Sequence, residues 1–189
     1  MKKRFTILFG AFCALMILIS MPGKAVGQVS SATPANGNSY VVAAYVNNKY
    51  YALPNGAVNG GTITGVEIQL NALNKVNTSV ASGKTWTLEE GSGNYTGKYY
   101  IKYTSGSDTY YLYKNGTGNS NYNFAVNKTS KNYWSFTTNG TGYTVAAVDR
   151  GSNNLNIQCN SGTFRCYRDA TAIRLLEIGD VPSYTVTAE

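Results

Sequence analysis

The chain contains no histidine and only three cysteines among its 189 residues. Histidine is the usual general base near neutral pH and the commonest metal ligand, so its absence excludes Ser-His-Asp triads, Cys-His pairs and histidine-ligated zinc sites. The sequence also lacks a glycine-rich phosphate-binding loop and a dinucleotide-binding fingerprint. We therefore predict a protein that is not an enzyme, with no catalytic residues, no metal site and no cofactor.

Only one long apolar run is present, and it lies at the N-terminus. Residues 2–4 are basic, residues 5–21 are predominantly apolar, and small residues follow at Ala25 and Gly27. This order is typical of a secretory signal peptide of bacterial type, here residues 1–27, cleaved after Gly27. An uncleaved anchor is the alternative, but the run is short for a spanning helix of about 20 residues. We expect a secreted protein, in the extracellular space, at the cell surface or in the periplasm, with no membrane span after cleavage.

The positive charge of the chain belongs mostly to this leader. Four of the 16 lysines and arginines lie in it, so the mature chain keeps twelve basic residues against nine acidic ones. A balance so close to neutral removes the main indication of nucleic-acid binding, and nucleic acid is not an expected partner. The residues that remain, about 160, are enough for one domain with its own core.

Cys159 and Cys166 are the two cysteines that follow the leader. Residues 160–162, Asn-Ser-Gly, form a turn signal between them, so the two cysteines flank the turn of a predicted hairpin. An even pair in an exported chain is a disulfide candidate. We predict a Cys159–Cys166 disulfide, with two buried free thiols as the alternative.

The mature chain divides into a flexible N-terminal segment (28–39), a folded domain (40–180) and a C-terminal tail (181–189). Short runs rich in Tyr, Val, Ile, Thr and Phe recur between polar turns throughout the domain, which predicts an all-β fold. Three blocks share an order of strands and turns, at about 40–90, 95–139 and 142–180. Each block closes on two large residues with one spacer between them: Trp86 and Leu88, Trp134 and Phe136, Ile173 and Leu175.

Three four-stranded blocks of this kind resemble a β-trefoil. The resemblance implies twelve strands, of which six form a barrel and six form three capping hairpins, with each apolar face buried against its neighbours. Trp86 and Trp134 then belong to the core, because Ile173 takes the equivalent place in the third block. A β-sandwich is the alternative, since short strands with regular turns also build that fold.

The third block is similar to one repeat of a ricin-type lectin. The stretch "VDRGSNNLNIQCNSG" contains an Asp near the first turn, an apolar strand with Gln, and a Cys-Asn turn. The closing Gln-x-Trp of that family is absent. The resemblance implies a lectin-like, carbohydrate-binding module, with a glycan or cell-surface polysaccharide as its partner. Asp149 and Asn154 would bind sugar hydroxyls, and Phe164 or Tyr167 would stack on the sugar ring.

Six tyrosines fall within the stretch "GKYYIKYTSGSDTYYLYKNG", residues 97–116. Strand alternation places Tyr99, Ile101 and Tyr103 on one face and Tyr100 on the other. Some of these tyrosines therefore belong to the core and some to the surface. Exposed Tyr, Asn, Ser and Gly are also typical of protein-binding surfaces. The alternative function is accordingly a protein-interaction module, such as a protease inhibitor, a toxin-like effector or a surface-assembly component.

Overall fold

Thirteen β-strands carry nearly all regular structure in the computed structural model, which describes residues 28–58, 60–115, 123–148 and 155–183. Helical structure in these ranges is limited to α1 (Thr78–Ala81) and the 3-10 turn η1 (Gly93–Tyr95). The prediction of an all-β protein is confirmed. The expected signal peptide lies outside the described residues.

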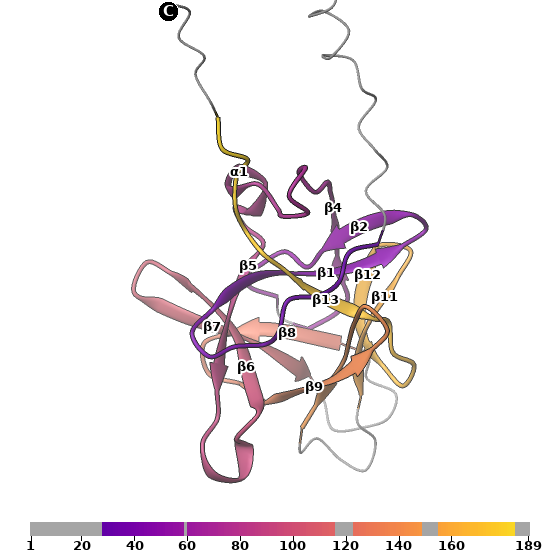
Figure 1. The fold of residues 1–189 in the computed structure, drawn as a ribbon. Coiled ribbons are helices and arrows are strands. Elements are labelled where there is room, and N and C mark those ends of the chain that lie inside the picture. The colour runs from indigo at the N-terminus through magenta and orange to yellow at the C-terminus, as the bar shows by residue number, and fades with distance from the viewer. Residues whose placement is uncertain (1–27, 59, 116–122, 149–154, 184–189) are drawn as a thin grey trace, which may run out of the picture.

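The strands follow one another with short connections, except for a longer excursion between β2 and β5 (Figure 1). In chain order they are β1 (Ser39–Val46), β2 (Lys49–Ala52), β3 (Ile63–Thr64), β4 (Val66–Ile68), β5 (Thr85–Glu90), β6 (Lys98–Ser105), β7 (Asp108–Asn115), β8 (Asn123–Asn127), β9 (Trp134–Asn139), β10 (Gly142–Ala147), β11 (Asn156–Asn160), β12 (Thr163–Tyr167) and β13 (Ile173–Leu176).

Six of these strands pair in a closed cycle. β1 pairs with β5, β5 with β6, β6 with β9, β9 with β10, β10 with β13, and β13 again with β1, always antiparallel. Six further strands extend hairpins from this cycle, in the series β1–β2–β4, β6–β7–β8 and β10–β11–β12. The two-residue strand β3 pairs with β12. Closure of the cycle leaves none of the six strands as an open edge.

The pairing register recurs between the first and last strand of each block. In each block a tyrosine on the first strand stands directly opposite the first of the two large residues on the last strand. The three register pairs are Tyr40↔Trp86, Tyr99↔Trp134 and Tyr143↔Ile173. The three blocks therefore use one register, although their loops differ in length.

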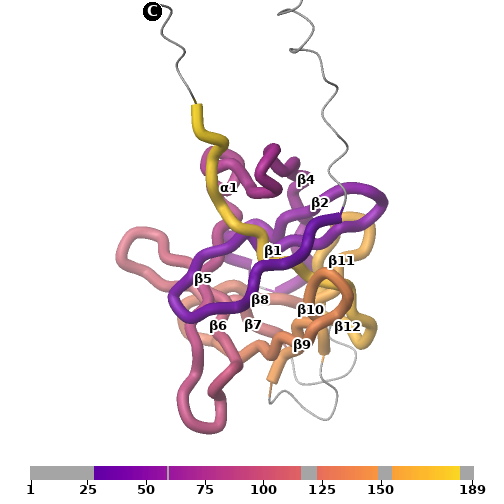
Figure 2. The backbone as a smooth tube through the Cα atoms, in the orientation of Figure 1, coloured from indigo at the N-terminus to yellow at the C-terminus, as the bar shows by residue number. Residues whose placement is uncertain are grey.

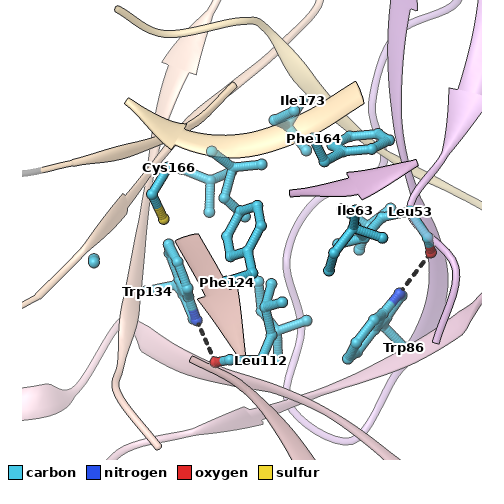
Figure 3. Close-up of a cluster of buried hydrophobic side chains, with 14 of the residues drawn as sticks. Leu53, Ile63, Trp86, Leu112, Phe124, Trp134, Phe164, Cys166 and Ile173 are labelled. Carbon is cyan, nitrogen blue, oxygen red and sulfur yellow. Dashed lines mark hydrogen bonds between the residues drawn. The ribbon is translucent and has the colours of Figure 1, made fainter. Parts of the chain in front are cut away.

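The core fills the space between the strands of the cycle and the hairpins. Trp86 and Trp134 are both fully buried, so their predicted place in the core is confirmed. The indole nitrogen of Trp86 donates a hydrogen bond to the carbonyl of Leu53 over 2.8 Å, and that of Trp134 donates to the carbonyl of Leu112 over 3.1 Å (Figure 3). Each indole thus buries its large apolar surface and still satisfies its one donor.

A second, smaller cluster lies on the other face of β1. Val41 and Ala43 of β1 pack there with Ile68 of β4, Val76 and Ala81 of the excursion between β2 and β5. Val42 and Ala44 alternate with them and belong to the main core. Because both faces of β1 are covered, its sequence is a continuous apolar run and not an alternation of apolar and polar residues.

Residues 28–39 run along the domain (Figure 2) and make backbone hydrogen bonds with it. The Ser31 N–H donates to the Thr141 carbonyl over 2.7 Å, and the Ala32 N–H donates to the Leu175 carbonyl over 2.9 Å. A segment made of small polar residues is usually a solvated linker. Here it forms hydrogen bonds with β13 and with the residue before β10. Its composition does not reveal this long-range pairing.

Arg174 ties this segment to the domain. Its side chain is fully buried, and its Nε donates to the Val29 carbonyl over 3.0 Å. The other two guanidinium nitrogens donate to the Ala172 carbonyl and to the Thr141 hydroxyl. A buried charge needs its donors satisfied, and backbone and hydroxyl oxygens fulfil that need among the described residues.

The predicted Cys159–Cys166 disulfide is not formed, and both thiols are free and buried. Residues 161–162 do form the turn between β11 and β12, as expected. The register, however, places Cys159 opposite Phe164 and Cys166 opposite Ile157. The two cysteines are thus diagonal neighbours, whose Cα atoms lie about 7–8 Å apart in such a pair, too far to bridge without backbone movement.

Candidate ligand-binding surfaces

The β11–β12 hairpin carries polar and aromatic side chains on its outer face. Ser161 and Gly162 close the hairpin with φ values of +48° and +84°, the left-handed conformation that a tight two-residue turn requires. On the outer face, Arg165 pairs with Gln158 across the strands, and its Nε donates to the Gln158 Oε1 over 2.7 Å. The Arg165 guanidinium also lies 4.8 Å from the centre of the Tyr167 ring.

The structure separates the four residues predicted to bind sugar. Tyr167 lies on the outer face and is partly exposed. Phe164 is fully buried in the main core, so it offers no face to a sugar and the expectation for this residue is corrected. Strand alternation explains the difference, because residues three apart on one strand point to opposite faces. Asp149 and Asn154 lie outside the described residues.

A second surface, built by the second block, consists of stacked tyrosine rings. Tyr95 of η1 stacks on Tyr133, which directly precedes β9, with ring centres 4.3 Å apart and planes inclined by 19°. Tyr133 in turn stacks on Tyr100 of β6, at 4.0 Å and 18°. Tyr111 of β7 meets Tyr100 edge to face at 5.5 Å. Four partly exposed rings from four chain segments thus form one continuous row.

Lysines lie against both ends of this row. The Lys98 ammonium is 5.3 Å from the centre of the Tyr95 ring. The Lys131 ammonium is 4.8 Å from the Tyr100 ring and 5.2 Å from the Tyr111 ring. All three distances fall within the range in which a cation is attracted to an aromatic face. We call Tyr95, Lys98, Tyr100, Tyr111, Lys131 and Tyr133 the tyrosine–lysine surface.

Gly91 makes the stack possible. A Cβ atom at this position would lie 2.5 Å from the Tyr95 Cβ and 2.7 Å from the Tyr133 Cε1. Either separation is shorter than carbon atoms tolerate, and the nearest contact is at the root of the Tyr95 side chain, where rotation gives little relief. The absence of a side chain at Gly91 therefore lets the two rings approach the end of β5.

Carboxylates near the tyrosine–lysine surface are already paired. Glu89 of β5 forms an ion pair with Lys102, and Asp108 of β7 forms one with Lys128. Burial of the ring and a hydrogen bond with Tyr133 both raise the pKa of Tyr100. The Tyr100 hydroxyl is therefore protonated at physiological pH and is already hydrogen-bonded to Tyr133.

The inner tyrosines of the same hairpin have a different role. Tyr103 stacks on Tyr110 with ring centres 5.0 Å apart and meets the edge of Trp86 at 5.5 Å. Tyr99 is buried beside Trp134, its register partner. The predicted division of this stretch into core and surface tyrosines is confirmed. Tyr95, Lys131 and Tyr133 were not predicted as part of the outer surface, because they lie in loops outside the tyrosine-rich stretch.

No helix within the described ranges is long and apolar enough to cross a bilayer. In the same ranges, no three His, Cys, Asp or Glu side chains come together in a group that could hold a metal ion. Comparison of the chain with models of known protein families, with curated proteins and with solved structures finds no match. Function is therefore inferred from the geometry of the two surfaces described above.

Proposed function

We propose that the protein is a secreted bacterial binding module with a β-trefoil fold and no catalytic activity. The closed cycle of six strands and the common register of the three blocks favour the trefoil over a β-sandwich, in which two sheets keep separate edges. Export is supported by the order of charged, apolar and small residues in residues 1–27. Intact-mass analysis of exported protein beginning at Gln28 tests the cleavage.

The ligand that we propose is a glycan, bound at the outer face of the third block. One observation carries this proposal: Tyr167, Gln158 and Arg165 present an aromatic ring, an amide and a guanidinium together on one partly exposed face. Sugar recognition needs an apolar face for the ring carbons and polar groups that fix the hydroxyls. Asp149 and Asn154 belong to the same proposal through the lectin-like sequence of this block.

A glycan array probed with the exported protein tests the proposal. We expect Tyr167→Ala and Asp149→Ala to lose the glycans that the wild type binds and to keep melting temperatures close to that of the wild type. Asp169→Ala is the matched control, because Asp169 is an exposed acid close to the same hairpin. The third-block site is wrong if both test variants bind every glycan as the wild type does.

A protein-interaction module is the second candidate function. The tyrosine–lysine surface favours it, because partly exposed tyrosines are common anchors in protein interfaces. Pull-down of a defined partner that depends on Tyr100 or Tyr133, without any glycan binding by the protein, would support this function over the first.

A further inference from the structure

We propose that the tyrosine–lysine surface is a second binding site, for the carboxylates and hydroxyls of an acidic polysaccharide. This inference goes beyond the function proposed above, because it concerns a different block and a different ligand chemistry. It stands on the charges of the surface, on the polar edges of its rings and on their fixed arrangement.

The charge of the surface is positive and is not cancelled from within. Among the described residues, neither Lys98 nor Lys131 has a carboxylate within ion-pair distance, and Lys131 is exposed. The nearby carboxylates already have partners. Glu89 forms an ion pair with Lys102, and Glu90 accepts a hydrogen bond from the backbone N–H of Gly97. The carboxylates of an incoming polymer would therefore meet an ammonium group at each end of the row, without having to displace an existing ion pair.

The tyrosines supply the contacts that a sugar needs besides charge. Tyr95, Tyr133 and Tyr100 cover one another's faces, so a ligand meets the edges of these rings, where their hydroxyl groups lie. Phenolic hydroxyls donate and accept hydrogen bonds, as sugar hydroxyls do. Aromatic rings that end in a hydroxyl group suit a ligand that has both apolar carbon surfaces and hydrated hydroxyl groups.

The arrangement is fixed before any ligand arrives. Tyr100 and Tyr111 project from paired strands, and the close approach at Gly91 holds Tyr95 and Tyr133 in the stack. A site whose side chains are already ordered loses less conformational entropy on binding, so weak polar contacts are enough to give measurable affinity. A flexible row of lysines alone would lack this advantage.

A protein partner fits the surface less well. Tyrosine anchors of protein interfaces fill desolvated pockets of the partner, whereas the ring faces of this row are already covered by one another. Among the described residues, the exposed large apolar side chains are Val66, Leu73 and Val181, and none belongs to this surface. Charge and hydroxyl groups dominate here, which is the chemistry of an acidic sugar chain.

Binding of the exported protein to polygalacturonate tests the proposal, with fully methyl-esterified polygalacturonate as the matched ligand without charge. We expect the acidic form to bind at low salt, the esterified form to bind at least tenfold more weakly, and added salt to weaken the binding of the acidic form. Lys98→Gln with Lys131→Gln should reduce binding at least tenfold. Lys49→Gln, which removes an exposed lysine on the first block, should leave it unchanged.

Three outcomes would overturn the proposal. One is the absence of binding to polygalacturonate. Another is equal binding of the acidic and esterified forms, or equal binding by the double lysine variant and by Lys49→Gln. The last is retention of an acidic peptide in place of the polysaccharide, which would identify a protein site. Tyr167→Ala separates this site from the third-block site, because it should leave polygalacturonate binding intact.

Discussion

Trp134 donates its indole N–H to the backbone carbonyl of Leu112, and Trp86 makes the same bond to Leu53. In both cases a residue at the start of the closing strand reaches a carbonyl in the region of the second strand: Leu112 lies within β7, and Leu53 directly follows β2. Ile173 takes this place in the third block and has no donor to offer. The blocks therefore share a core position, while only two of them use it for a hydrogen bond.

Trp134→Ala should destabilise the domain by about 3–5 kcal/mol, because it removes a fully buried ring and leaves a cavity. Trp134→Phe keeps much of the volume but leaves the Leu112 carbonyl without its donor, which costs about 1–3 kcal/mol. Urea unfolding measures both changes. Thr137→Ala, on the exposed part of β9, is the control and should change the free energy of unfolding by less than about 0.5 kcal/mol.

The recurrence of a large closing residue in the three blocks predicted the core tryptophans. Strand periodicity was enough to predict the all-β class and the two faces of the tyrosine hairpin. Each of these depends on local alternation, which any register preserves. The prediction of the disulfide was wrong for the opposite reason, because a disulfide depends on which residues stand directly opposite each other. Cys159 stands opposite Phe164, two positions before Cys166 on the same strand. The prediction that Phe164 binds sugar was also wrong, because neither the composition nor the lectin-like motif indicated which face of β12 points inward.

The tyrosine–lysine surface could be predicted only in part. Tyr100 and Tyr111 lie in the tyrosine-rich stretch and on its outer face. Tyr95 and Tyr133 come from short loops before β6 and β9, and their meeting depends on long-range pairing. The one local signal was an aromatic residue in each of two polar loops, which by itself indicates no contact.

The thiols of Cys159 and Cys166 should be unreactive in the native exported protein. A colorimetric disulfide reagent should detect no thiol before unfolding and two after it, and the intact mass should not change on reduction. Burial is the reason, since the thiolate is the reactive form and an apolar site disfavours it. A mass that rises by two hydrogens on reduction would contradict the free thiols.

The same burial makes stability depend on alkaline pH. Desolvation raises the pKa of Cys159 from 9.0 to about 11, and it also raises that of Cys166. Above pH 9 the unfolded chain releases these protons while the folded chain keeps them, so the contribution to stability is complete below pH 9 and is lost as pH rises to about 11. Urea unfolding at pH 7.5 and about pH 10 should show a smaller alkaline loss in Cys159→Ala with Cys166→Ala than in wild type.

Arg174→Met should destabilise the domain by more than about 3 kcal/mol, because it leaves three oxygen acceptors without the guanidinium that serves them. It should also release the segment around Val29, which becomes sensitive to an added aminopeptidase. Arg168→Met is the control, since Arg168 is exposed. If the segment stays protected in Arg174→Met, the guanidinium is not what anchors it.

Gly91→Ala should disturb the tyrosine row without affecting the core. The added methyl group would lie 2.5 Å from the Tyr95 Cβ, so either the end of β5 or the η1 turn must move, at a cost of about 1–3 kcal/mol. Near-ultraviolet circular dichroism should lose part of the tyrosine signal, because stacked rings couple and separated rings do not. Gly56→Ala is the matched control, since a Cβ there meets no atom within 4 Å and its backbone is not in the left-handed region. If the tyrosine signal of Gly91→Ala equals that of Gly56→Ala, the stack does not depend on the close approach at Gly91.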